Sequence, residues 1–512
     1  MKKVCLFMFC LSFVANAQQP QFWDGKNGMF HGISLGNSVW WRAQEDANLG
    51  QNTLADYVRM REIGFNTVRF YLDYKFFESD AAPYQYKQAG WDFLNRNLEW
   101  AKANGIKLIL NMHVPQGGFQ SNAEGGALWE VEENQKRLIA LWREIAKRYV
   151  NETAIIAYDI LNEPVVSKDK SQWQALAQKI VNAIREVDTN HFIFVERING
   201  ILPNNYSSDA EMNFVFISDP ANKWGLTFHF YSPISYTHQY ASWIPAFKNT
   251  DGGKYPDPTV PQFDGEKWKG ATFENQTVPK GNSDWAFYTG VWKTAADLSD
   301  GNIGRPALEF SNLGEGTVWF DHVVFEKKSP DGVVSTIATY QFPRGAGAWY
   351  FWTEKPGGRM IENENAVGFT GTVSAANYGC STFIALEQGW SYRASGRMKG
   401  ENIPEMAACR LRFDWNLANN IRTRDKTALE QEVLSYLKIA QAKNLPIYLG
   451  EFGVMKQTLT EEKGGAVWVR DMVEIMKAHR VPFTYHVWET DDVFGVKGNA
   501  KLEAVLKAAF KP

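Results

Sequence analysis

The chain has 512 residues, a formal net charge of −3 and 14% aromatic residues. Charges of both signs are scattered along it, so it has no basic stripe of the kind that nucleic acids or anionic membranes require, and we expect a neutral ligand. Because the length exceeds what one hydrophobic core usually serves, we also expect a large domain with a second module.

The N-terminal segment has the three parts of a secretory signal. Two lysines precede an apolar run that closes on Ala15-Asn16-Ala17. We therefore predict a signal peptide over residues 1–17, cleavage near Ala17, and a periplasmic or extracellular protein. No later apolar run reaches the roughly 18 residues that a spanning helix needs, so we expect no membrane span.

Two cysteines, Cys380 and Cys409, lie outside this segment. They are too few for the disulfide framework of a small secreted scaffold. Their sequence separation does not decide between one bridge and two separate buried thiols, because a disulfide depends on the distance between the two Cα atoms.

Short apolar runs alternate with amphipathic helical patterns through most of the chain, which favours a parallel sheet with both faces covered. One predicted helix has a stripe of Leu138, Trp142, Ile145 and Tyr149, and another has Leu429, Val433, Leu437 and Ala440. The eight predicted strands lie in residues 30–36, 66–70, 107–113, 155–164, 192–196, 226–231, 446–453 and 483–489.

Eight strand and helix pairs predict an α/β protein with a (β/α)₈ TIM barrel. A doubly wound open sheet is the alternative. It is disfavoured because the first strand, ISLGNSVW, is followed by neither a G-x-G-x-x-G nor a G-K-[ST] sequence.

The alternation stops between the sixth strand and the following helix. There, short strand-like segments are separated by Gly, Pro, Asp and Asn turns, which predicts an inserted all-β sandwich over residues 271–417. The barrel would then comprise residues 18–270 and 418–512. Candidate sugar-stacking tryptophans are Trp40, Trp41 and Trp243 in the barrel part and Trp285, Trp319, Trp349, Trp352 and Trp390 in the insert, although core packing is the ordinary fate of each.

In a TIM barrel the reacting groups lie at the carboxyl ends of the strands. The polar or amphipathic residues that end these runs are Arg69, His113, Asn162, Glu163, His229, Tyr231, Glu451 and Trp488. Glu163 and Glu451, on the fourth and seventh strands, should face each other across the barrel mouth. A pair of carboxyl groups, one protonated and one charged, is what cleavage of a glycosidic bond needs.

The segments ILNEP and LGEFG around these glutamates resemble the retaining (β/α)₈ glycosidases, specifically glycoside hydrolase family 5, the cellulase family. The resemblance covers about two thirds of the chain and implies that Glu163 is the acid/base and Glu451 the nucleophile. It also implies that the sugar at the cleavage point is surrounded by Arg69, His113, Asn162, His229, Tyr231 and Trp488. In the insert, GTVWFDHVVFE and YRASGRMKG resemble strands of carbohydrate-binding modules.

Individual roles follow from side-chain chemistry. Arg69 should keep Glu451 ionised. Asn162 is expected to donate to the sugar 2-hydroxyl, Tyr231 to Glu451, and Trp488 to form an apolar floor under the sugar. His113 and His229 have neither H-x-H nor H-E-x-x-H spacing, so we predict no metal and no organic cofactor.

These features together favour a monomeric retaining hydrolase of β-linked polysaccharide or oligosaccharide, with an endo-β-1,4-glucanase preferred. A β-mannanase, a xyloglucanase or a β-1,3-glucanase would share the same catalytic pair. A barrel without activity, in a glycan-binding protein whose sandwich does the binding, is the competing hypothesis. It is disfavoured because both glutamates are present.

Overall fold

The structure is a computed structural model. It describes residues 29–37, 39, 51–121, 124–202, 213–244, 247–248, 251–263, 266–272, 278–295, 301–342, 349–353, 358–371, 376–380, 383–418, 421–490 and 492–510. The predicted signal peptide, Trp40 and Trp41 lie outside these residues. The chain forms two compact units. The first, the barrel unit, holds the described residues up to Phe230 together with Glu432–Phe452 and those from Val473 onward, and the second, the insert unit, holds Tyr231–Gln431 and Gly453–Met472.

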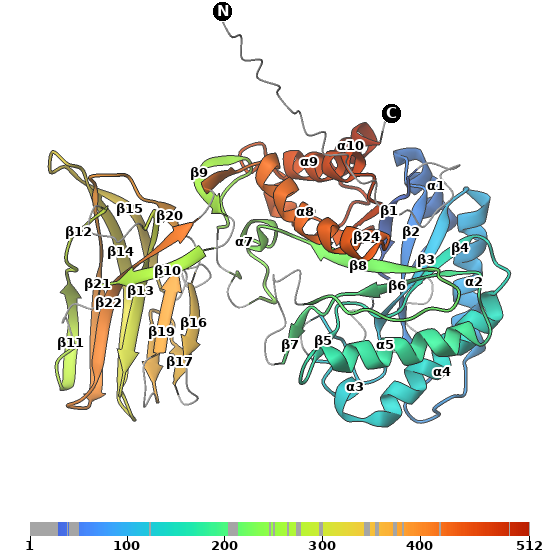
Figure 1. Ribbon diagram of the computed structural model, residues 1–512, viewed down its shortest axis with the longest axis horizontal. Helices are drawn as coiled ribbons and strands as arrows, with labels where there is room; N and C mark the ends of the chain where they lie inside the picture. Colours follow the sequence, from blue (N-terminus) through green and yellow to red (C-terminus); the bar gives the residue numbers. More distant parts are fainter. Residues whose placement is uncertain are drawn as a thin grey trace, which may run out of the picture. The chain divides into compact units, whose positions relative to one another are not determined.

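Eight parallel strands close into a barrel, which confirms the predicted fold class. Figure 1 shows the ring of strands and the helices outside it. In their order around the barrel, the strands are β1 (His31–Leu35), β2 (Thr67–Asp73), β3 (Lys107–Val114), β4 (Ile155–Asp159), β6 (Phe192–Glu196), β8 (Trp224–Phe230), β24 (Ile447–Phe452) and β25 (Phe483–Tyr485). Every residue of β2, β8 and β24 is buried, as expected for strands covered on both faces.

Helices follow most of these strands along the chain. They are α1 (Leu54–Ile63), α2 (Gln88–Ala103), α3 (Ala127–Glu130), α4 (Glu132–Tyr149), α5 (Lys170–Arg185), α7 (Ile234–Thr237), α8 (Lys426–Lys443), α9 (Gly465–Ala478) and α10 (Ala500–Ala509), with the 3₁₀ turns η1 (Tyr74–Phe76) and η4 (Lys456–Thr458). The predicted stripe of α4 is buried. Tyr436 of α8 stacks on Phe228 of β8, with ring centroids 4.6 Å apart, so this helix covers the outer face of the barrel there.

The insert follows β8 in the chain and contains two antiparallel sheets. One sheet consists of β10 (Glu266–Ala271), β13 (Ile303–Ser311), β16 (Trp349–Thr353), β19 (Ala376–Cys380), β20 (Ile384–Ala385) and β22 (Ala408–Ala418). The other consists of β11 (Gly281–Tyr288), β12 (Lys293–Thr294), β14 (Thr317–Lys328), β15 (Val334–Gln341), β17 (Arg359–Glu362), β18 (Val367–Thr370) and β21 (Ser391–Ile403).

The two sheets share one hydrophobic core, so the insert is a sandwich. Leu308 and Phe310 of β13 lie in this core beside Val318 and Phe320 of β14. The strands of both sheets run from Glu266 to Ala418, whereas the sequence interpretation placed the insert at residues 271–417.

Two short pairs of strands complete the description. β5 (Val165–Val166) pairs with β7 (Gly200–Ile201), and β9 (Asp257–Phe263) pairs with β23 (Ile421–Arg424). The second pair lies on either side of the sandwich in the sequence.

Cys380 and Cys409 are separate buried thiols. Among the described residues, no helix is both long and apolar enough to cross a bilayer.

Candidate active site

Polar side chains on alternate positions of the barrel strands point into the barrel near the carboxyl ends. On β2, Arg69 and Tyr71 stand two residues apart and share a face, because side chains in a strand alternate between its two sides. The same spacing places Asn111 and His113 together on β3. Further strand-end residues are Asp159 of β4, Glu196 of β6 and His229 of β8.

Glu451 reaches the interior through a β-bulge. The pairing of β24 with β8 shifts between Leu449 and Glu451, so that Glu451 stands opposite His229. The extra residue is Gly450, and a Cβ atom there would lie 2.8 Å from the hydroxyl oxygen of Thr227. Only glycine fits this position without displacing its neighbours, and the bulge turns the next side chain inward.

Three neighbouring groups keep Glu451 ionised. The Arg69 guanidinium lies 2.5 Å from its Oε1, and the Tyr71 hydroxyl donates to the same oxygen at 2.6 Å. Burial by itself would raise the pKa of Glu451, but nearby cations, His229 first among them, hold that pKa well below its usual value. Burial raises the pKa of Tyr71 well above 10, so its hydroxyl keeps the proton that it donates.

Glu163 follows β4 in an unusual backbone conformation. Its φ angle is +44°, in the left-handed region that residues with a Cβ atom rarely adopt. Its Oε1 lies 2.8 Å from Nδ1 of His229. Carboxylate oxygens of Glu163 and Glu451 and a ring nitrogen of His229 all lie within 4.8 Å of one another. The side chain of Glu163 is 16% exposed and that of Glu451 is 6% exposed, so both glutamates face a common point that solvent can reach.

His229 lies among three carboxylates. Besides Glu163, it has Glu451 Oε2 at 3.5 Å from Nδ1 and Glu196 Oε1 at 3.4 Å from Nε2. Burial lowers the pKa of His229, but these carboxylates, Glu196 first, raise it to about 9. The imidazole is therefore a cation at neutral pH.

Asn162 and His113 also lie beside Arg69 and Tyr71. Asn162 accepts from Arg69 Nη2 at 2.9 Å through Oδ1 and donates from Nδ2 to the hydroxyl of Ser121 at 3.0 Å. The His113 ring stacks on Tyr71 at 3.8 Å between centroids. Because burial lowers the pKa of His113 well below 6.5, this imidazole is neutral.

The expectation that Trp488 ends the eighth strand is wrong. β25 ends at Tyr485, and Trp488 is only 2% exposed, with its indole N–H donating to Asp56 at 3.0 Å. The aromatic residue on the inner face is His486, whose Nδ1 lies 3.0 Å from the Tyr71 hydroxyl and 3.8 Å from Glu451 Oε2.

Tyr231, which was expected to donate to Glu451, belongs to the insert unit, where its ring meets His238 edge to face at 4.8 Å. The Tyr71 hydroxyl donates to Glu451, and a bond from Tyr231 to Glu451 stays a prediction. The sequence interpretation therefore missed Tyr71, Glu196 and His486. Signals existed for the first two, since Tyr71 shares the face of Arg69 and Glu196 ends the apolar run FIFVE.

Glu163, His229 and Glu451 form a group whose donor atoms are close enough together to hold a metal ion. Their chemistry disfavours one. A protonated imidazole has no lone pair for a metal, and Glu451 is already compensated by Arg69. The expectation of a metal-free site stays a prediction.

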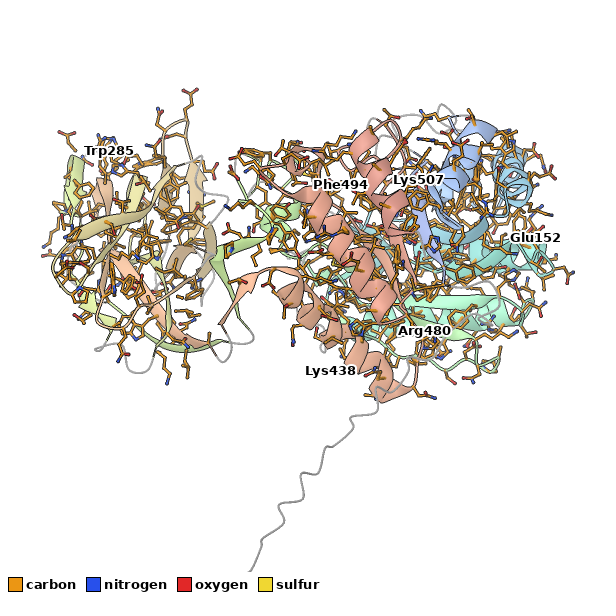
Figure 2. All side chains as sticks on the ribbon, turned by 90° about the horizontal axis from the view of Figure 1, so that it is seen from above. Glu152, Trp285, Lys438, Arg480, Phe494 and Lys507 are labelled. Atoms are coloured by element: carbon orange, nitrogen blue, oxygen red, sulfur yellow. The ribbon has the colours of Figure 1, made fainter. Side chains whose placement is uncertain are left out.

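The tryptophans of the insert have different environments. Trp349 is buried in the sandwich core, and Trp390 is half-buried under Lys327. Trp285, labelled in Figure 2, and Trp319 together line a hollow of about 370 Å³ on the sandwich. Its polar lining includes Asn363, Asn365, Lys399 and Glu401. The side chain of Trp352 lies outside the described residues, and Trp243 of the insert unit is 51% exposed.

A closed (β/α)₈ barrel with two converging carboxylates at its carboxyl end defines the class of retaining glycosidase barrels. Comparison with known sequences agrees with this class. A family model described as cellulase, glycosyl hydrolase family 5, matches residues 24–281, just over half of the 512 residues. The chain belongs to this family.

Individual relatives match over shorter stretches. Endoglucanase C of Acetivibrio thermocellus is 38% identical over 192 residues, which are 37% of this chain and 53% of that protein. Cellodextrinase A of Ruminococcus flavefaciens is 25% identical over 238 residues, 45% of this chain and 66% of that protein. The chain thus spans about half the length of the first of these relatives and about two thirds of the second.

Among solved structures, that of the endoglucanase Cel5A from Thermotoga maritima is similar, with a TM-score of 0.51 and 16% identity. The likeness covers 94% of this chain and 97% of that one, and it concerns the fold. The family match ends at residue 281, before Glu451, so the assignment of the second carboxylate depends on the barrel geometry and the LGEFG segment.

Proposed function

We propose that this protein hydrolyses β-linked glucan by double displacement and is an endo-β-1,4-glucanase. The observation that carries the proposal is the convergence of Glu163 and Glu451, whose nearest oxygens lie within 4.8 Å. Retaining glycosidases hold their two carboxyl groups about 5 to 5.5 Å apart, whereas inverting enzymes need a wider gap that admits water.

The two carboxyl groups have different roles in this mechanism. Glu451, kept ionised by Arg69 and Tyr71, attacks the anomeric carbon and forms a glycosyl-enzyme ester. Glu163, the more exposed of the two, gives its proton to the departing glycosidic oxygen. It then removes a proton from the water that hydrolyses the ester, which regenerates both groups.

The relatives favour glucan over other β-linked polymers. The name endoglucanase recurs among them and cellodextrinase occurs once, although β-mannan, xyloglucan and β-1,3-glucan would fit the same catalytic pair. A product profile of the protein on a panel of these polysaccharides tests the choice. Turnover of mannan alone, for example, would contradict the glucanase proposal and leave the mechanism intact.

The mechanism itself is tested with Glu451→Ala and with the stereochemistry of the product. We expect the variant to lose nearly all turnover while it still binds polysaccharide, because only the nucleophile is removed. The first product of the unaltered protein should keep the β configuration by NMR. An inverted product, or full turnover by the variant, would refute double displacement at Glu451. A chain that binds glycan and hydrolyses no β-glycan would support the non-catalytic alternative.

A second candidate function is glycan binding by the sandwich. It is supported by the hollow that Trp285 and Trp319 line, since flat aromatic faces beside amide and charged groups suit a sugar ring. In the Glu451→Ala background, the additional change Trp285→Ala should weaken binding to soluble β-glucan by calorimetry. Trp390→Ala, whose ring lies under Lys327, is the matched control. Equal affinity of Glu451→Ala and its two double variants would contradict glycan binding in this hollow.

The signal-peptide pattern supports one more proposal, export of the protein with cleavage near Ala17. N-terminal sequencing of the protein from culture fractions tests it. A mature chain that starts at Gln18 outside the cytoplasm is expected, and a retained chain that keeps residues 1–17 would refute it.

A further inference from the structure

Glu196 is a buried carboxylate that the proposed reaction does not use. It is the last residue of β6 and is 2% exposed, so substrate does not reach it as it reaches Glu163. Its two oxygens face different parts of the catalytic group. Oε2 accepts the backbone N–H of Glu163 at 3.0 Å, and Oε1 lies 3.4 Å from Nε2 of His229.

The contact with the backbone matters because of the conformation of Glu163. A residue with a Cβ atom is less stable at a φ of +44° than in an ordinary conformation, so the surroundings must hold it. Pro164 follows and offers no N–H of its own. The end of β6 and the segment after it hold both residues. Glu196 accepts the N–H of Glu163, and the N–H of Asn199 donates to the carbonyl of Pro164 at 2.7 Å.

The contact with the imidazole is an ion pair, at a distance at which Nε2 of His229 makes no hydrogen bond to Glu196. His229 directs Nδ1 to Glu163 and Glu451 and Nε2 to Glu196. One cation therefore lies between three acidic side chains. Asp159 and Arg69 are the other charged groups that act on Glu196, and Glu163 acts on it from the segment after β4. Gly450 leaves the space for this arrangement, because a Cβ atom there would lie 3.1 Å from Nε2 of His229.

We propose that Glu196 is a positioning residue for the acid/base: it fixes the strained backbone at Glu163 and keeps His229 oriented and protonated between the two catalytic carboxylates. The inference rests on the proposed function and adds a third acid to its site. The charges around the two groups support it: burial raises the pKa of Glu196 to about 8, whereas the neighbouring carboxylates, Glu196 first, raise the pKa of His229 to about 9 against the effect of its burial.

The test compares Glu196→Gln with the unaltered protein on two substrates. A cello-oligosaccharide needs a proton on its leaving oxygen, whereas a 2,4-dinitrophenyl β-cellobioside does not. The kcat/KM on the oligosaccharide should fall roughly 10-fold to 100-fold, and that on the activated glycoside should change much less. A purely structural residue would lower both by the same factor.

The pH profile gives a second readout. Glu196 raises the pKa of His229, so in the glutamine variant the imidazole should lose its proton at a lower pH. The alkaline limb of the kcat/KM profile should therefore move to lower pH. Asp188→Asn is the matched control. Asp188 pairs with His191 at 2.5 Å just before the other end of β6, with similar burial and no contact with Glu163.

The outcomes are distinct. Equal loss on both substrates, an unmoved alkaline limb, or the same changes in Asp188→Asn would overturn the inference. If Glu196→Gln does not fold, Glu196→Asp replaces it, since it keeps the charge and loses reach to the Glu163 N–H. It should lower kcat/KM on the oligosaccharide and leave the alkaline limb in place, and unaltered kcat/KM would overturn the inference. Failure of the proposed function is recognised separately, because the unaltered protein would then cleave neither substrate.

Discussion

The guanidinium of Arg69 and the hydroxyl of Tyr71 both reach Glu451 Oε1 because the two residues share one face of β2. At the scale of single residues, this shared oxygen determines how well Glu451 attacks. A nucleophile with two donors on one oxygen is held in one orientation.

Tyr71→Phe removes one of these donors without a change in ring shape. We expect kcat/KM to fall roughly 10-fold to 100-fold. The pKa of Glu451 should also rise, because the phenol stabilises its ionised form, so the acid limb of the pH profile should move to higher pH. Rates measured from pH 3 to 9 check both. Tyr448→Phe, a buried tyrosine bonded to Thr484 in the same barrel, should leave the acid limb unchanged.

Trp488→Phe tests whether the Trp488 ring supports the buried structure or forms the floor under the sugar. Loss of the indole N–H bond to Asp56 should lower the free energy of unfolding by about 1 to 2 kcal/mol and change kcat/KM by less than about twofold. His486→Ala, beside Glu451, should lower kcat/KM roughly tenfold with less effect on stability. Calorimetry and kinetics on both variants decide. A large loss of activity in Trp488→Phe would support the prediction that the Trp488 ring lies under the sugar.

At the scale of elements, α1 is tied to the segment after β25 through Asp56. This carboxylate accepts the N–H of Thr53 at 2.9 Å, in a capping box at the start of α1. It also accepts the Trp488 indole N–H and pairs with Lys497 at 2.7 Å. One buried side chain thus joins segments more than 400 positions apart in the chain.

Asp56→Asn should lower the free energy of unfolding by about 1 to 2 kcal/mol near neutral pH. Burial alone would raise the pKa of Asp56, but the bonds from Lys497, Trp488 and Thr53 lower it below 3.8. A carboxyl group with a lowered folded pKa contributes stability above its unfolded pKa and loses it as pH falls through the folded value. Denaturant unfolding at several pH values should therefore show a difference that is constant above about pH 5 and vanishes at lower pH. A difference that grows on acidification would contradict this assignment.

Strand periodicity and the rule for strand ends predict the barrel and most of its inward polar residues, including Glu163 and His229. They fail where local geometry departs from a regular strand. The bulge at Gly450 turns Glu451 inward against the simple alternation from Tyr448, and the sequence carries only a glycine as its sign. β25 ends at Tyr485, three residues before Trp488, so the predicted strand end selected Trp488 in place of His486.

At the scale of the whole molecule, the sandwich has a hydrophobic core of its own. The residues of that core all lie between Val278 and Leu411. Residues 266–418 expressed alone should therefore fold with a cooperative thermal transition and a β-rich circular dichroism spectrum. A fragment that stays unfolded in solution would mean that the sandwich needs the rest of the chain.

The insertion after β8 separates the last two barrel strands from the first six in the chain. A ribosome that adds about 5 to 20 residues per second needs roughly 10 to 40 seconds between the end of β8 and the start of β24. During that interval β1 and β8 lack their final neighbours, and their free backbone groups are open to pairing with other chains. Conditions that slow elongation should therefore increase aggregation of the newly made protein.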